Sequence, residues 1–271
     1  MRTMSEPGRV VVDDAELYYE VRGSGPVLLI VQGGASDAGA TELLVAALAH
    51  RFRVVTYDRR GLSRSSSGGG TVTVSTHADD AARVLDEVSA APARVYGVSI
   101  GALIGLHLAV VAPGRVSTLV AHEPPMPSVV RDVDRERVMD QVEATFRRDG
   151  PAAAVQAMAA LVGATPGAVQ CEAGARPTPP VGDAIANFQR FFAHDFPAVR
   201  SSSLAVEAVA AVRGPVVIPT GGVLSRGRWE YRCAEVLSIA LGRALTEMPG
   251  GHNGPVTHPR ATATALEELL A

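Results

Sequence analysis

The stretch Gly97-Val98-Ser99-Ile100-Gly101 lies between two apolar segments of different character. The segment before it, residues 93–96, is short and contains β-formers, which predicts a buried strand. The segment after it, residues 102–111, is rich in Ala and Leu and long enough for a helix. A Gly-x-Ser-x-Gly sequence at a strand-to-helix junction predicts a nucleophile elbow, a strained turn whose flanking glycines avoid collisions with strand and helix. The turn directs the Ile100 N–H, at the helix N-terminus, toward a developing oxyanion. A plain glycine-rich turn is the alternative, and the strand and helix on either side favour the elbow.

The composition of the 271 residues is that of an ordinary globular protein, with 47% hydrophobic and 20% charged residues. This length suits one large α/β domain, or one domain with an insertion. The net charge of −3 offers no basic field for nucleic acid. Arginine supplies every basic residue, a usage typical of a GC-rich genome such as that of an actinobacterium. We find no signal peptide and no run approaching the roughly 18 apolar residues of a membrane span, so we expect a cytoplasmic protein without a membrane partner.

Apolar strands and helices alternate along the chain, with one interruption. The expected strands are residues 9–12, 17–21, 27–31, 52–57, 93–96, 116–121, 216–220 and 244–248. Residues 27–31 are apolar at every position, which is typical of a strand inside a mainly parallel sheet. Residues 126–200 contain helical stretches and no good strand. The pattern predicts an α/β fold with a doubly wound, mostly parallel, eight-stranded sheet. Its core comprises residues 1–122 and 201–271, and residues 123–200 form an inserted helical lid.

Three motifs occupy matching places in a known family. They are the elbow at Ser99, the turn Asp58-Arg59-Arg60-Gly61-Leu62-Ser63 after the fourth strand, and Gly250-Gly251-His252 after the last strand. The arrangement resembles the α/β-hydrolase superfamily over nearly the whole chain, and in particular its lid-bearing members with a serine nucleophile. The resemblance implies that His252 is the base that activates Ser99. It also implies a structural role for Asp58, which would brace the loops beside the elbow.

The acid of the expected triad departs from the commonest pattern of that superfamily. The turn after the seventh strand reads Thr220-Gly221-Gly222-Val223-Leu224-Ser225 and holds no carboxylate. A second placement known in the superfamily, after the sixth strand, is occupied by Glu123. Its role would be to fix the tautomer of His252 and to stabilise the imidazolium. The alternatives are that Glu123 caps the strand or pairs with an arginine, which would leave a Ser–His dyad or a repurposed site.

The second oxyanion donor is expected from the loop after the third strand, Gln32-Gly33-Gly34. Many members of the superfamily have His-Gly there. A backbone donor does not depend on that side chain, so the Gly34 N–H is the candidate. The N–H of the adjacent Gly33 or Ala35 is the alternative.

Aromatic residues gather in the predicted lid, and Phe188, Phe191 and Phe192 are candidates for an apolar roof over the substrate. The alternative is that they only attach the lid to the core. His77 opens a predicted helix, where we expect a capping or surface residue.

No metal or cofactor motif is found. Asp79-Asp80 and the pair Asp132/Asp134 have no nearby His or Cys cluster. The glycines at 68–70 lack the Lys and hydroxyl of a phosphate-binding loop, and Gly33-Gly34 lacks dinucleotide-binding spacing. Cys171 and Cys233 are far apart and are expected to be free thiols.

The sequence therefore predicts a serine hydrolase that cleaves a small-to-medium apolar ester or lactone through an acyl-enzyme. Two other functions stay open. The first is a repurposed enzyme of natural-product biosynthesis that performs C–C hydrolysis, cyclisation or elimination, and the second is a non-catalytic ligand-binding protein. The expected partner is a small molecule, and the oligomeric state is left open, a homodimer included.

Overall fold

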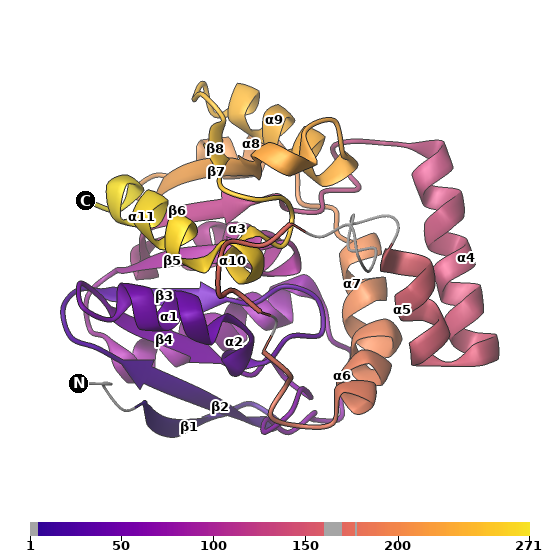
Figure 1. Ribbon diagram of the computed structural model, residues 1–271, viewed down its shortest axis with the longest axis horizontal. Helices are drawn as coiled ribbons and strands as arrows, with labels where there is room; N and C mark the ends of the chain where they lie inside the picture. Colours follow the sequence, from indigo (N-terminus) through magenta and orange to yellow (C-terminus); the bar gives the residue numbers. More distant parts are fainter. Residues whose placement is uncertain (1–4, 160–169, 177) are drawn as a thin grey trace.

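The computed structural model describes residues 5–159, 170–176 and 178–271. An eight-stranded sheet in the order β1-β2-β4-β3-β5-β6-β7-β8 runs through its centre (Figure 1). The strands are β1 (Glu6–Val12), β2 (Ala15–Arg22), β3 (Val27–Val31), β4 (Arg53–Tyr57), β5 (Ala93–Val98), β6 (Val116–His122), β7 (Val216–Gly222) and β8 (Thr246–Met248). Strands β1 and β2 pair antiparallel, β2 joins β4 antiparallel, and every later pair is parallel. The predicted doubly wound, mostly parallel sheet is confirmed.

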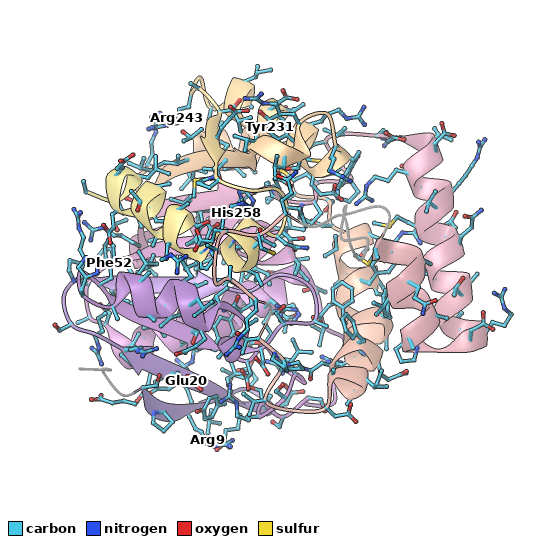
Figure 2. All side chains as sticks on the ribbon, in the orientation of Figure 1. Arg9, Glu20, Phe52, Tyr231, Arg243 and His258 are labelled. Atoms are coloured by element: carbon cyan, nitrogen blue, oxygen red, sulfur yellow. The ribbon has the colours of Figure 1, made fainter. Side chains whose placement is uncertain are left out.

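Helices cover both faces of the sheet. On one face α2 (Val74–Val88), α3 (Ile100–Val111), α8 (Val206–Ala211) and α9 (Trp229–Ala240) enclose the larger apolar core. On the other face α1 (Glu42–Leu48) and α11 (Pro259–Leu269) enclose the smaller one, where Phe52 packs (Figure 2). The short helices are η1 (Ala38–Thr41), η2 (Pro113–Arg115), η4 (Val223–Ser225) and α10 (Gly254–Thr257). The sequence analysis did not predict α8.

Strand β3 shows why its sequence is apolar throughout. Side chains alternate between the two faces of a strand, so a strand covered on both faces buries every residue. Leu29 and Val31 enter the larger core, whereas Leu28 and Ile30 enter the smaller one. All four are fully buried.

The chain leaves the sheet after β6, and we call residues 123–200 the β6–β7 insertion. Its elements are α4 (Val133–Asp149), α5 (Pro151–Ala159), α6 (Ala184–Arg190), the π-helical turn η3 (Phe191–Asp195) and α7 (Phe196–Arg200). These helices lie together at one end of the sheet (Figure 1). They share a third apolar cluster that contains Phe191, Phe192 and Phe196. Within this insertion, the described residues 170–176 and 178–182 hold no helix or strand.

In the part of the chain that the structure describes, each helix is too short or too polar to cross a bilayer.

Candidate active site

Ser99 lies in a strained turn between β5 and α3. Its φ of 55° and ψ of −123° are unfavourable for a residue with a side chain. The Ser99 N–H donates to the His122 carbonyl at 2.9 Å, which ties the turn to the end of the neighbouring strand β6. A Cβ on Gly101 would lie 2.0 Å from the Val31 carbonyl oxygen, and one on Gly97 would lie 2.4 Å from the Gly101 carbonyl oxygen. Both glycines of the motif are therefore required by close backbone packing.

A Gly101→Ala substitution is expected to lower the free energy of unfolding by about 3 kcal/mol or more, because the new methyl group meets rigid backbone. Gly114→Ala is the matched control, since a Cβ there meets nothing within 4 Å. Urea denaturation of both variants measures the difference. Equal stabilities would show that the elbow does not need its second glycine.

His252 and Glu123 form a buried pair across the carboxyl ends of the strands. The His252 Nδ1 lies 2.7 Å from the Glu123 Oε2. Glu123 directly follows β6, has no exposed surface and adopts a φ of 49°. His252 lies between β8 and α10 and is 7% exposed. The hydrogen bond leaves the Nε2 of His252 on the opposite side of the ring, free to exchange a proton.

The electrostatics of this pair favour an ionised carboxylate and a basic imidazole. Burial raises the pKa of Glu123, but the hydrogen bond and charge of His252 outweigh it and lower that pKa to about 2. Burial lowers the pKa of His252, but the hydrogen bond and charge of Glu123 raise it above its ordinary value. A neutral histidine that gains a proton during a reaction would therefore be stabilised by Glu123.

The loop after β3 lies next to the elbow and is held by a buried arginine. Gly34 adopts a φ of 48°, which favours glycine. The Arg59 side chain donates to the Gln32 carbonyl at 2.8 Å and to the Gly34 carbonyl. Within the described residues, the backbone N–H groups of Gly34 and Ile100 have no hydrogen-bond acceptor. Both N–H groups are thus available to a ligand.

A cavity of about 320 Å³ connects these groups. Ser99, His252, Ile100 and Gly34 all line it. Among the described residues no hydrogen bond joins the Ser99 hydroxyl to His252, as is common for catalytic groups before substrate binds. Most of the remaining wall is apolar and includes Phe188, Phe191, Phe192, Phe196, Met139, Met158, Val155, Pro125 and Val256.

Comparison with known proteins shows the family of the chain. A model of the alpha/beta hydrolase fold matches residues 26–200, about two thirds of the chain. The chain belongs to the α/β-hydrolase family. It is 31% identical over 268 residues to an uncharacterized hydrolase of Bacillus subtilis, YraK, covering 97% of this chain and 95% of that protein.

Solved structures share the fold of this α/β-hydrolase. An esterase from Thermogutta terrifontis superposes with a TM-score of 0.76 at 20% identity, covering 98% of both chains. An enol-lactonase from Burkholderia xenovorans superposes with a TM-score of 0.70 at 17% identity, covering 97% of this chain and 99% of the other.

The turn after β7 holds Glu123 although it contains no acid of its own. The Gly222 N–H donates to the Glu123 Oε1 at 2.8 Å, and the Ser225 hydroxyl donates to the same oxygen. A Cβ on Gly222 would lie 2.5 Å from the backbone of Gly251 in the His252 loop. The sequence analysis did not predict that Gly222 and Ser225 hold Glu123. The adjacent glycines Gly221 and Gly222 were the one signal in the sequence, because they indicate that other backbone packs closely against this turn.

His77 is neither a cap nor a surface residue, so that prediction is wrong. The side chain is fully buried, and its Nε2 lies 3.0 Å from the Asp195 Oδ1. The other oxygen of Asp195 accepts from Arg59 at 3.0 Å. The β6–β7 insertion thus reaches the arginine that holds the Gly34 loop.

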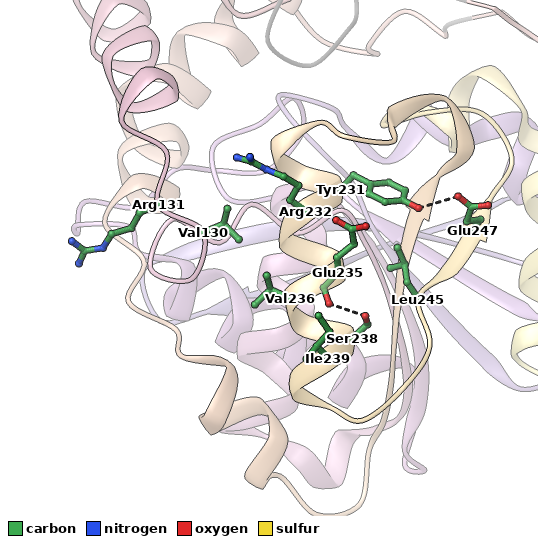
Figure 3. A pocket seen from close by; sticks show the side chains of 10 residues that line it. All are labelled: Val130, Arg131, Tyr231, Arg232, Glu235, Val236, Ser238, Ile239, Leu245 and Glu247. Atoms are coloured by element: carbon green, nitrogen blue, oxygen red, sulfur yellow. Dashed lines mark hydrogen bonds between the residues drawn. The ribbon is translucent and has the colours of Figure 1, made fainter.

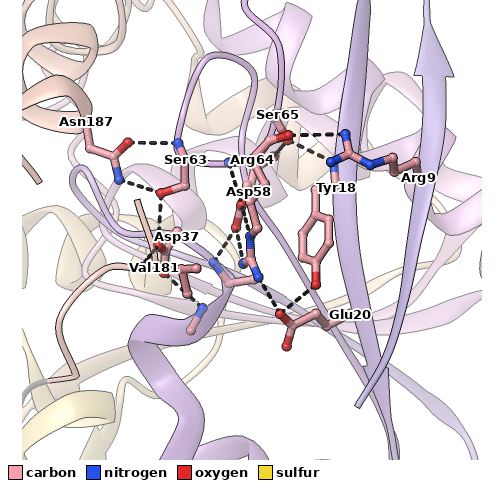
Figure 4. A network of polar contacts seen from close by, with 12 residues as sticks. Arg9, Tyr18, Glu20, Asp37, Asp58, Ser63, Arg64, Ser65, Val181 and Asn187 are labelled. Atoms are coloured by element: carbon pink, nitrogen blue, oxygen red, sulfur yellow. Dashed lines mark hydrogen bonds and ion pairs between the residues drawn. The ribbon is translucent and has the colours of Figure 1, made fainter. Parts of the chain in front are cut away.

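Asp58 holds backbone beside the elbow. Its Oδ1 accepts from the Ala38 N–H at 2.8 Å, and its Oδ2 accepts from the Arg64 N–H at 3.0 Å and the Arg64 Nε at 2.7 Å. Nearby, Asp37 accepts from the Ser63 hydroxyl and from the Val181 N–H (Figure 4). These are the contacts of a structural residue in the turn after β4.

A larger hollow of about 840 Å³ lies on the outer side of α9 (Figure 3). Its lining includes Tyr231, Glu235, Ile239 and Glu247, and none of the predicted site residues. The hollow is open to solvent and contains no serine–histidine arrangement, so the smaller cavity at Ser99 is the candidate active site. Within the described ranges no three His, Cys, Asp or Glu residues are grouped to hold a metal ion.

Proposed function

We propose that this α/β-hydrolase is a serine hydrolase that cleaves a small-to-medium apolar ester or lactone. One observation carries the proposal. His252, hydrogen-bonded to the buried Glu123 at 2.7 Å, lines the same cavity as a serine held at a strained elbow. A serine hydroxyl is a weak nucleophile alone and becomes effective beside an oriented base.

In the proposed reaction the Ser99 Oγ attacks the substrate carbonyl carbon while the His252 Nε2 accepts the hydroxyl proton. Glu123 keeps the proton of the Nδ1 in place and stabilises the imidazolium. The N–H groups of Ile100 and Gly34 donate to the oxyanion. The imidazolium returns the proton to the leaving alkoxide, and the acyl group remains on Ser99. His252 then deprotonates a water that attacks the acyl carbon. The bond from that carbon to the Ser99 Oγ breaks, the imidazolium returns its proton to the Oγ, and the carboxylic acid leaves.

The β6–β7 insertion serves as the lid in this proposal, with residues 123–200 as its extent. Phe188, Phe191 and Phe192 line the cavity and also pack on one another, with ring centroids of Phe191 and Phe192 5.2 Å apart. They therefore join the lid helices and form an apolar wall for the substrate. An apolar wall favours the uncharged hydrocarbon parts of an ester or lactone.

Turnover of p-nitrophenyl butyrate tests the proposal. We expect continuous release of p-nitrophenol over many equivalents, because the acyl-enzyme is resolved by water that His252 activates. Release of one equivalent and no more would indicate a ligand-binding protein with a reactive serine. No release by the folded protein would overturn ester hydrolysis and favour a repurposed reaction.

A further inference from the structure

The wall of the candidate active-site cavity contains a pair of charged side chains that the proposed reaction does not use. Among its described lining residues, Arg135 and Glu230 are the only ones with a guanidinium or a carboxylate. Arg135 lies in the first turn of α4 in the β6–β7 insertion, and Glu230 lies in the first turn of α9. Their side chains are 13% and 4% exposed and form an ion pair from the Arg135 Nη2 to the Glu230 Oε1.

The pair is held in place from several sides. The guanidinium of Arg135 lies 3.6 Å from the ring centre of Trp229. The Trp229 indole donates to the Val130 carbonyl at 2.8 Å. A second ion pair, Arg232 to Asp132 at 2.6 Å, joins the same two helix ends. The Arg135–Glu230 pair is therefore a fixed part of the cavity wall.

The hydrogen-bonding capacity of the pair is only partly used. Within the described residues, the Arg135 Nη1 and the second carboxylate oxygen of Glu230 have no protein partner. Neither atom is among the fully enclosed polar atoms without a partner. A charged group taken out of water is stabilised when its remaining donors and acceptors are satisfied. The pair thus offers a donor and an acceptor to a molecule in the cavity.

The pair is neutral as a whole, and this decides what it can bind. A carboxylate on the substrate would meet the negative charge of Glu230, and an ammonium would meet the positive charge of Arg135. A neutral hydroxyl or primary amide both accepts and donates, so it matches the two free atoms without a charge conflict. The pair also lies within electrostatic range of His252. Burial and Glu123 have the largest effects on the pKa of that histidine; smaller effects come from Glu230, which raises it, and Arg135, which lowers it.

We propose that Arg135 and Glu230 form a specificity site for a neutral hydroxyl or amide group on the part of the substrate remote from the scissile carbonyl. The substrate class is then an ester or lactone with an apolar body that carries such a group. This inference rests on the proposed ester or lactone hydrolysis.

Three p-nitrophenyl esters test it, with equal methylene chains that end in an isopropyl group, a primary amide or a carboxylate. The three ends have nearly the same shape, and several chain lengths are compared. At the best length we expect kcat/KM for the amide ester to exceed that of the other two by roughly tenfold or more, as for a hydrogen bond to a charged group. The double variant Arg135→Met/Glu230→Met is expected to lose this preference, so that its ratio of amide to isopropyl kcat/KM falls to near one.

Arg232→Met is the matched control, because Arg232 joins the same two helices but does not line the cavity. It is expected to keep the ratio of amide to isopropyl turnover. A ratio near one in the wild type, or a ratio that the double variant leaves unchanged, would overturn the specificity site. Preference for the carboxylate ester would contradict the proposal that the site binds a neutral group. Failure to hydrolyse any of the three esters would overturn the proposed function and this inference with it.

Discussion

Replacing Ser99 with alanine is expected to lower kcat for p-nitrophenyl butyrate by roughly 10⁶-fold, the scale seen when a serine nucleophile is removed from a triad. His252 and the two proposed oxyanion donors remain, but no hydroxyl is left to form the acyl-enzyme. The variant is expected to fold normally, because alanine adds no atom to the turn at φ 55°. Steady-state kinetics, with thermal melting as a check on the fold, measures both effects.

Ser36→Ala is the control for this variant, since Ser36 is another serine that lines the same cavity. It is expected to retain activity within a few-fold. A Ser99→Ala enzyme that kept a tenth of the wild-type rate would contradict the role of Ser99.

Replacing Glu123 with glutamine is expected to lower kcat/KM by roughly 10³- to 10⁴-fold at pH 8, because an amide neither fixes the reactive tautomer of His252 nor stabilises the imidazolium. The pH profile gives a second readout. The wild-type rate falls as pH falls through a His252 pKa that lies above the ordinary value. The variant lacks the carboxylate that raises this pKa. The midpoint of the acid limb of its pH profile is therefore expected to shift to lower pH.

Glu247→Gln is the control for the acid, since Glu247 is a carboxylate on β8 that pairs with Arg226 and does not line the cavity. Its rate and pH profile are expected to match the wild type. A Glu123→Gln enzyme with full activity and an unshifted profile would show that another group, or none, supports His252.

Local sequence patterns were enough to predict the sheet and the elbow. Strand β3 is apolar at every position because it is buried between two layers of helices, and such a run is visible in the chain itself. The glycines around Ser99 likewise record backbone contacts that exclude a Cβ. The pairing of Glu123 with His252 was predicted through resemblance, because the two residues are separated by 129 positions.

Contacts made only by folding escaped the sequence analysis. His77 looks like a helix-start residue, yet its partner Asp195 is 118 positions away in the β6–β7 insertion. The Arg135–Glu230 pair spans 95 positions. No periodicity links such residues, and each looks like a solvated charge until the helices are placed. The π-helical turn at Phe191–Asp195, whose aromatic rings pack in the apolar cluster of the insertion, was likewise not predicted.

Intact-mass analysis after reaction with a fluorophosphonate tests the central claim, that Ser99 is a nucleophile activated by His252. The Ser99 oxygen would attack phosphorus and release fluoride, leaving one stable adduct. We predict fast addition of a single label to the wild type, no label on Ser99→Ala, and greatly slowed labelling of His252→Ala. A folded wild type that stays unlabelled, or a Ser99→Ala variant that labels as fast as the wild type, would contradict the account.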